Sequence, residues 1–201
     1  MWAPVSISST SASALRSSLA LVLVAAASAQ AAGAAAAGAA AAGAAAAKAA
    51  ARVFPPPLVL ERGSVELTAE QSERIRIAAG TARPSSHVET FVAREPGGAA
   101  AGYAYLDRHL VRTLEETLFV ALDPAARVVR VEVLAFDEPP EYRPSVRWFQ
   151  QFEGRTLSPE LRLKRGIRTL AGATLSSHAA TDAVRRVLAL HGILHPPEPA
   201  P

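Results

Sequence analysis

The chain has 201 residues, with 21 basic and 18 acidic side chains and a formal charge of +3, which is too balanced to indicate a nucleic-acid groove. It has no cysteine, which excludes disulfides, thiolate zinc sites, iron–sulfur clusters, c-type haem attachment, a lipoprotein anchor and a thiol nucleophile. Hydrophobic residues make up 50% of the chain, enough to bury a globular core.

Residues 1–29 are predicted to be an export signal. Arg16 precedes an apolar run from Leu19 to Ala27, and Ala27-Ser28-Ala29 has the small-x-small pattern of a cleavage site. The alternative is an uncleaved anchor, because Leu19 to Ala47 is long enough to span a bilayer, although alanine and glycine drive insertion weakly. Both interpretations place the protein outside the cytoplasm, in the periplasm or on the outer face of the cytoplasmic membrane.

Residues 30–52 are an alanine-rich segment of low complexity in which glycine recurs every fifth residue. We expect a spacer that buries no core and is helical only from Ala44 to Phe54, where three prolines stop it. The folded domain is expected to begin near Val53 and to span residues 53–195. Residues 196–201 are expected to be a disordered tail.

A short helix is predicted over Ala69–Ala79, because Thr68 and Gln71 form a capping box and Gly80 follows as a C-terminal cap. Strand-like runs with turn residues between them come next, and the last two are typical of an antiparallel hairpin. The four predicted strands are His87–Arg94, Ala100–Leu106, Glu116–Leu122 and Arg127–Phe136.

The remaining third of the chain is predicted to be mostly irregular until its last helix. Residues 137–144 are too proline-rich for regular structure, and Ser145 can cap a short helix that ends at Gly154. A short extended piece is expected over Gly166–Leu170, and a closing helix over Ser177–His191, ended by Gly192. The fold class is therefore α+β, an antiparallel sheet with packed helices.

The segment before the closing helix has the features of a phosphate site. Gly172 and Ala173 let a ligand approach the backbone, and the hydroxyls of Thr174, Ser176 and Ser177 cluster at a helix N-terminus, which favours an anion. The alternative is structural, with Ser176 or Ser177 capping the helix and Gly172 serving a turn. No nucleotide P-loop or dinucleotide fingerprint is present.

The segment Gly172-Ala173-Thr174-Leu175-Ser176-Ser177 resembles the Gly-Ala-Thr-x-Ser/Thr motif of the FMN-binding domain family. That domain occurs in the NqrC and RnfG subunits of respiratory complexes and in many exported flavoproteins. The resemblance covers residues 102–194. Its other matches are Gly102-Tyr103, the hairpin of residues 119–134, the acidic loop at Glu138-Pro139 and the segment Gln151-Phe152-Glu153-Gly154.

The resemblance implies that a flavin transferase outside the cytoplasm esterifies Thr174 to the phosphate of FMN. Gly172, Ala173 and Leu175 would lie against the phosphate, and Ser176 and Ser177 would donate hydrogen bonds to it. The family carries Asp and Ser or Thr where this chain has Arg168 and Ala171, so covalent and non-covalent binding both stay open. The implied neighbours of the isoalloxazine ring, with loop anchoring and core packing as their alternative roles, are Glu138, Tyr142, Trp148 and Phe152.

The expected function is electron transfer through FMN, to or from a membrane cytochrome or a respiratory complex, with no catalytic residue of the protein's own. Two alternatives are an extracytoplasmic flavin-dependent reductase and a flavin-free binding or scaffold module. No metal site is expected, because Gly192 and Pro196 break the helix that the pair His191 and His195 would need.

Overall fold

The computed structural model describes residues 38 and 40–196. The chain divides into two units, Met1–Ala41 and Ala42–Pro201, and the fold described below is that of the second. The expected export signal and the expected tail from residue 197 onward lie outside the described residues. In the described part, no helix combines the length and the apolar character that crossing a membrane requires.

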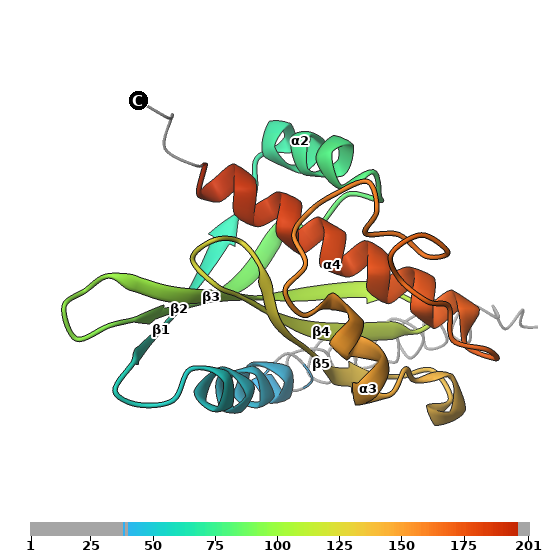
Figure 1. Ribbon diagram of the computed structural model, residues 1–201, viewed down its shortest axis with the longest axis horizontal. Helices are drawn as coiled ribbons and strands as arrows, with labels where there is room; N and C mark the ends of the chain where they lie inside the picture. The colour runs from blue at the N-terminus through green and yellow to red at the C-terminus, as the bar shows by residue number, and fades with distance from the viewer. Residues whose placement is uncertain (1–37, 39, 197–201) are drawn as a thin grey trace, which may run out of the picture. The chain divides into compact units, whose positions relative to one another are not determined.

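Five strands form one antiparallel sheet in the order β1-β2-β3-β4-β5, so each strand pairs with the next one along the chain. This sheet and its packed helices confirm the predicted α+β class (Figure 1). Strand β3 continues to Leu110, past the predicted end at Leu106, because its last residues pair with the start of β4. The strands are β1 Val59–Glu66, β2 His87–Arg94, β3 Ala100–Leu110, β4 Glu115–Leu122 and β5 Val128–Phe136.

Strand β1 was not predicted from the sequence. It lies at the edge of the sheet and pairs only with β2, and most of its residues are exposed. Its register is supported by ion pairs across the two strands, from Arg62 to Glu89 at 2.7 Å and from Arg94 to Glu61 at 2.8 Å. Pairing with β2 therefore makes this polar segment a strand that its own hydrophobic pattern does not indicate.

Helices α2 and α4 cover one face of the sheet (Figure 1). Helix α2 spans Ala69–Ala79 with the predicted capping box, and its C-cap Gly80 has φ of +64°. Helix α4 spans Thr174–Leu194, so it starts before the predicted Ser177 and continues through Gly192. The prediction that Gly192 ends this helix is wrong. The residues after it, Ile193 and Leu194, pack against the core, and that burial offsets the cost of about 1 kcal/mol for a helical glycine.

The opposite face of the sheet is covered by a helix of residues 42–53, which we call the alanine helix. Its Ala46, Ala49 and Ala50 are fully buried, and Phe54 follows them against the sheet. A Cβ atom on Gly102 of β3 would lie 2.3 Å from the Phe54 ring, so this glycine makes room for it. The expected spacer thus buries a second core in its later part, and the packed unit begins before Val53.

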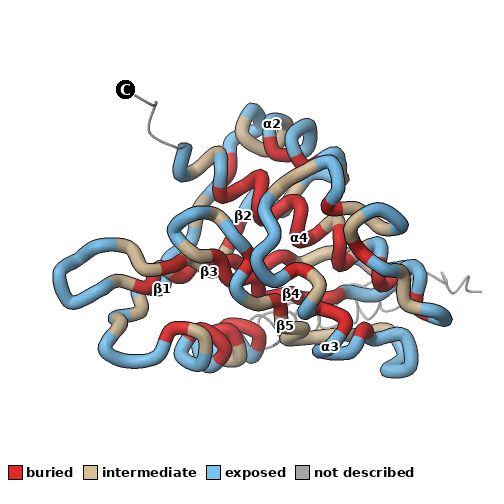
Figure 2. The backbone as a smooth tube through the Cα atoms, viewed as in Figure 1, coloured by how far each residue is buried: buried red, intermediate tan, exposed pale blue. Residues whose placement is uncertain are grey.

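The irregular segments follow the prediction in part. Ser145 caps helix α3, Val146–Phe149, which continues as the 3-10 turn η2, Gln150–Phe152. The proline-rich loop contains a 3-10 turn, η1, Pro140–Tyr142, rather than being wholly irregular. The prediction of an extended piece over Gly166–Leu170 is wrong, because the only pairing there is a single β-bridge between Leu163 and Ile167. Figure 2 shows that burial is concentrated in the central strands and α4.

Candidate functional site

Seven of the ten residues predicted to bind the cofactor line one cavity of about 270 Å³, which we call the threonine pocket. It lies where the N-terminus of α4 meets the turn between β3 and β4 and the loop after β5. Segments far apart in sequence are therefore brought together around Thr174. The residues lining the pocket are Val111, Arg112, Glu138, Tyr142, Gly172, Ala173, Thr174, Leu175 and Ser176.

Thr174 is the first residue of α4 and is exposed to solvent. Gly172, with φ of +81°, turns the chain into the helix, and the N-cap residue Ala173 has no side chain that could cap the helix amides. The first amides of the helix therefore lack side-chain partners, and the positive end of the helix dipole faces the pocket. The Thr174 hydroxyl makes no hydrogen bond to the described part of the chain. This is an accessible, unengaged nucleophilic oxygen beside an anion-favouring helix end.

Ser177 lies behind the pocket rather than in it. Its hydroxyl donates to the carbonyl of Ala173 at 2.8 Å and accepts from the amide of Leu170 at 3.2 Å. The side chain is fully buried, so the expectation that it donates to a phosphate is corrected. Ser177 instead fixes the loop that carries the motif. Ser176 is also buried, but it lines the pocket wall and is not a helix cap.

Glu138 shapes the pocket from the other side. One of its carboxylate oxygens accepts hydrogen bonds from the amides of Thr113 at 2.9 Å and Leu114 at 3.0 Å. These bonds, led by the one from Thr113, lower the pKa of Glu138. The carboxylate therefore stays ionised and ties the loop after β5 to the β3–β4 turn. This is the loop-anchoring role, and it engages the only carboxylate among the pocket residues.

Trp148 and Phe152 lie outside the threonine pocket. Both belong to the core under α4, and Phe152 is fully buried, so neither contacts the pocket as the structure stands. Trp148 donates its indole N–H to the carbonyl of Arg168 at 2.8 Å, and Gln151 accepts from the amide of Arg168, also at 2.8 Å. The aromatic segment thus has a packing role, and it clamps the backbone that leads to the motif.

Two pocket residues, Val111 and Arg112, were not predicted from the sequence. They follow the end of β3 and face the motif only because the β3–β4 turn folds toward α4. Arg112 is exposed and makes no ion pair within the described chain. Nothing in its immediate sequence marks it, since a lone arginine in a turn is ordinary. Its guanidinium adds a second anion-binding group to the helix end.

A second cavity, of about 430 Å³, adjoins the threonine pocket and shares Val111 and Leu175 with it. His109 and Arg186 line its inner side, and His178 and Asp182 lie along α4. Three exposed hydrophobic side chains, Leu110, Tyr142 and Leu175, lie along the two cavities. The two cavities therefore form a partly apolar site wider than the threonine pocket alone.

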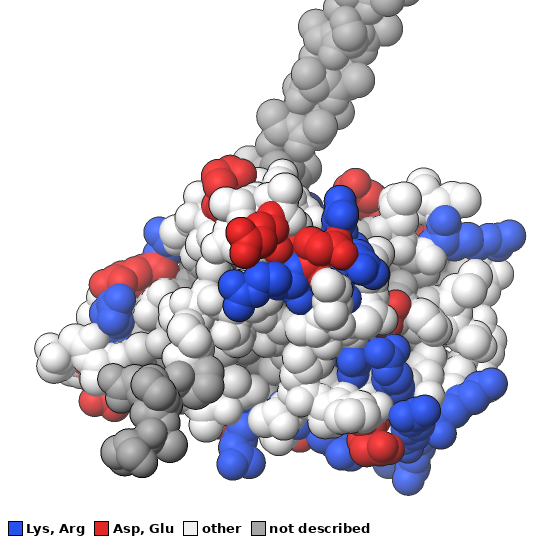
Figure 3. All heavy atoms as spheres, turned by 90° about the horizontal axis from the view of Figure 1, so that it is seen from above, with Lys and Arg blue, Asp and Glu red and all other residues white. Residues whose placement is uncertain are grey.

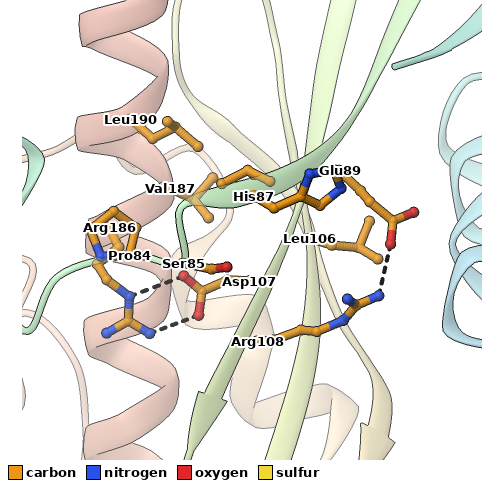
Figure 4. Close-up of a pocket in the computed structure, with 11 residues that line it drawn as sticks. Pro84, Ser85, His87, Glu89, Leu106, Asp107, Arg108, Arg186, Val187 and Leu190 are labelled. Carbon is orange, nitrogen blue, oxygen red and sulfur yellow. Dashed lines mark hydrogen bonds and ion pairs between the residues drawn. The ribbon is translucent and has the colours of Figure 1, made fainter. Parts of the chain in front are cut away.

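A buried charge network, which the sequence analysis missed, lies beneath the second cavity. His109 bridges two carboxylates, with its ring nitrogens 2.9 Å from Asp107 and 3.1 Å from Glu116. Arg186 binds Asp107 through two bonds of 3.0 and 2.7 Å (Figure 4). Burial alone would lower the pKa of His109, but hydrogen bonds to the two carboxylates outweigh it and raise the pKa to about 9. The protonated ring therefore balances the buried acids.

The space beside this network in Figure 4 is too small to be a ligand site. The cavity between α4 and β3 has a volume of about 20 Å³, which is room for about one water molecule. One wall carries the Arg186–Asp107 pair, and another carries the pair of Arg108 with Glu89 at 2.7 Å. The first pair joins α4 to β3, and the second joins β3 to β2.

Of the two histidines near the end of α4, His191 lies within the helix, which continues through Gly192 contrary to expectation, and His195 is the C-cap residue just after it. Their ring centroids are 4.9 Å apart, and His191 Nδ1 lies 2.8 Å from the hydroxyl of Tyr105. Burial lowers the pKa of His191 to about 4. Among the described residues, no group of three or more histidine or acidic side chains is placed to hold a metal ion.

Comparison with known proteins gives no independent identification. No family model matches the chain, and neither a curated protein nor a solved structure matches it. The geometry of the threonine pocket is therefore the structural basis for any assignment of function.

Proposed function

We propose that this protein is an extracytoplasmic electron carrier that binds FMN at the threonine pocket, with the flavin phosphate esterified to Thr174. The observation that carries the proposal is the exposed hydroxyl of Thr174, which makes no hydrogen bond within the described residues and lies at a helix N-terminus without a side-chain cap, inside a cavity lined by the motif residues. The resemblance to the FMN-binding domain names the ligand. The pocket supplies what a phosphate needs, which is free backbone amides, a helix dipole and a guanidinium.

The residues present fit FMN in chemistry and in room. The threonine pocket, at about 270 Å³, is small for a whole flavin, whereas ligand sites commonly enclose about 300–1,000 Å³. The adjoining cavity of about 430 Å³ extends the site into that range. Leu175, with 57% of its surface exposed, lies between the two and offers an apolar contact for a planar ring.

The threonine pocket lacks the side chains that catalysis would need, and this favours electron transfer as the function. Bound FMN would supply the redox chemistry, and the protein would hold it and exclude solvent on one side. Glu138 is the only carboxylate in the pocket, and its oxygen is engaged by the amides of the β3–β4 turn. No other side chain of the threonine pocket is a general acid or base suited to work near neutral pH, which a reductase acting on a small substrate would need. In the adjoining cavity, both ring nitrogens of His109 are engaged by carboxylates, and His178 lies 3.3 Å from Asp182.

Export and maturation are part of the same proposal. Residues 1–29 would direct the chain out of the cytoplasm, where a flavin transferase would reach Thr174. The hydroxyl oxygen would form the new bond to phosphorus and give up its proton, while the phosphorus–oxygen bond to the leaving nucleotide of a flavin dinucleotide donor breaks. This transfer requires an exposed side chain such as this one. A membrane cytochrome or respiratory complex would then exchange electrons with the bound flavin.

Intact mass tests the proposal directly. The protein is exported with and without a co-expressed flavin transferase, beside Thr174→Ala and the matched variant Thr174→Ser, which keeps a hydroxyl at the same place. We expect an FMN-sized increment in the wild type only with the transferase, none in Thr174→Ala, and some in Thr174→Ser.

Two other outcomes have definite meanings. Yellow protein of unmodified mass that loses its colour on denaturation would show non-covalent binding and would place the cause at Arg168 or Ala171. Colourless protein of unmodified mass in all cultures would contradict the flavoprotein proposal and favour a binding module.

A further inference from the structure

A broad groove lined by arginines lies beside the loop that leads to the threonine pocket. It has a volume of about 860 Å³ and is open to solvent, and we call it the arginine groove. Four arginines line it, together with the edge of Trp148 and the amide side chain of Gln151, and no acidic residue does. The four are Arg147, Arg155, Arg165 and Arg168.

The arginines of the groove differ from most others in the molecule because they have no acidic partner. Within the described chain, none of the four makes an ion pair, whereas several arginines of the sheet, of α2 and of α4 do, as Arg62 does with Glu89 and Arg186 with Asp107. Figure 3 shows basic side chains gathered at one end of the face that it presents. The groove therefore carries uncompensated positive charge in a protein whose net charge is only +3.

The backbone beneath these arginines is held in place. The carbonyl of Arg155 accepts from the amide of Val128 at 2.9 Å, which attaches the segment to β5. The backbone of Arg168 is held at two atoms, because its amide donates to the side chain of Gln151 and its carbonyl accepts from the indole N–H of Trp148. Arg147 lies in the capped helix α3. The charges thus project from a preorganised frame, and preorganisation reduces the entropy lost when a partner binds.

The groove is joined to the proposed flavin site by a short piece of chain. Arg168 and Thr169 line the groove, and Gly172, Ala173 and Thr174 line the threonine pocket. The hydroxyl of Ser177 fixes the loop between them. A molecule seated in the groove would therefore lie next to the segment that carries the flavin.

We propose that the arginine groove docks an acidic surface of the protein that exchanges electrons with the flavin at Thr174, an inference that rests on the proposed function. Guanidinium groups bind carboxylates through paired hydrogen bonds, so four unpaired arginines are complementary to a row of Asp or Glu side chains. The groove is wide and open to solvent, which gives room for a folded protein surface. It is also larger and more open than the threonine pocket, so it does not suit a single small anion.

The test measures binding of fluorescently labelled poly-L-glutamate by anisotropy in about 150 mM NaCl, where weak surface attraction is screened. Arg147→Gln/Arg165→Gln removes two charges from the groove. The matched control Arg74→Gln/Arg127→Gln removes two exposed arginines that do not line the groove and that make no ion pair within the described residues. We expect the groove variant to bind about tenfold more weakly than the wild type, or worse, and the control to bind within about twofold of it. Wild-type binding should weaken steeply as salt rises.

Three outcomes would overturn the docking proposal. One is that poly-L-glutamate does not bind, and another is that the two double variants lose binding equally, since attraction would then follow net charge alone. The third is retention on phosphatidylglycerol vesicles that depends on the groove arginines, which would make the partner a lipid surface.

The same titration on Thr174→Ala separates this proposal from the flavin proposal. That variant cannot carry the ester, so its binding of poly-L-glutamate tests the groove alone. The mass of the wild type tests flavin attachment alone. Circular dichroism of all variants checks that a loss of binding is not a loss of fold.

Discussion

Gly172 and Gly192 lie near opposite ends of the same helix, and at both an added Cβ would meet open space. Their backbones differ, because Gly172 has φ of +81° while Gly192 lies within helix α4. Gly172→Ala should therefore lower the free energy of unfolding by about 1–2 kcal/mol, whereas Gly192→Ala should raise it by about 0.5–1 kcal/mol. Urea denaturation of the two variants measures both effects.

Because the two substitutions are expected to change the free energy of unfolding in opposite directions, each variant serves as the control for the other. If Gly192→Ala instead lowered the free energy of unfolding, the last turn of α4 would be frayed or would depend on a contact other than packing against the core. A neutral Gly172→Ala would mean that the motif loop relaxes without strain, and the threonine pocket would then be less rigid than the hydrogen bonds of Ser177 indicate.

His109 couples stability to pH through its two carboxylate partners. Its pKa is raised from 6.5 to about 9 in the folded protein, so its contribution is complete below about pH 6.5 and is lost as the pH rises through 9. The free energy of unfolding should fall by on the order of 2–3 kcal/mol between these limits. His109→Gln, which cannot be charged, should be less stable at pH 6.5 and should show a flatter profile.

Denaturation curves at intervals between pH 6.5 and 9.5 check this prediction. Parallel profiles for the wild type and His109→Gln would show that the histidine is not the titrating group. Glu116→Gln offers a second measurement, since it removes one carboxylate partner and should bring the midpoint of the pH transition down.

The alanine helix is the element whose role changed most between sequence and structure. Ala49 is fully buried against the sheet, while Ala47 is exposed on the same helix. Ala49→Leu should cost about 1–3 kcal/mol by overpacking, and Ala47→Leu should change stability by less than about 0.5 kcal/mol. Thermal unfolding of both variants decides whether this helix is part of the folded unit. Equal, negligible effects would restore the spacer interpretation.

The elements that were predicted well have strong local signals. Helix α2 has the predicted bounds because its capping box and C-terminal glycine act within one turn of the chain. Strand β2 is set by its content of β-branched and aromatic residues and by the turn that follows it. Strand β1 was missed because its stability comes from its neighbour, and the expected strand at Gly166–Leu170 fails because no partner strand reaches it.

The candidate site was predicted as a motif but not as a pocket. The sequence indicated Thr174 with its neighbours in the motif and, through the family resemblance, Glu138 and Tyr142, and the structure brings these residues together in one pocket. It also adds Arg112, which no local pattern marks. Ser177 was expected to contact the ligand, and the aromatic pair was expected either to contact it or to pack in the core, whereas hydrogen bonding and packing place all three outside the threonine pocket. Contacts between distant segments decide which side of a loop a residue faces, and one sequence does not contain them.

At the scale of the whole molecule, both faces of the sheet are covered, and the proposed activities lie toward one end of it. The threonine pocket and the arginine groove share the loop between η2 and α4, so flavin and partner would meet on one segment. The rest of the fold positions that segment, through the core under α4 and through the buried pairs of α4 with β3.

The sequence by itself determined the α+β class, the bounds of α2 and β2 and the phosphate-site motif, because caps, turns and alternation act between residues close in the chain. The tertiary structure decided the remaining features. Burial against the sheet made the alanine segment part of the core, pairing made β1 a strand, and packing extended α4 past Gly192. These depend on free energy gained from surfaces that meet only after folding, and the threonine pocket is one of the places where such surfaces meet.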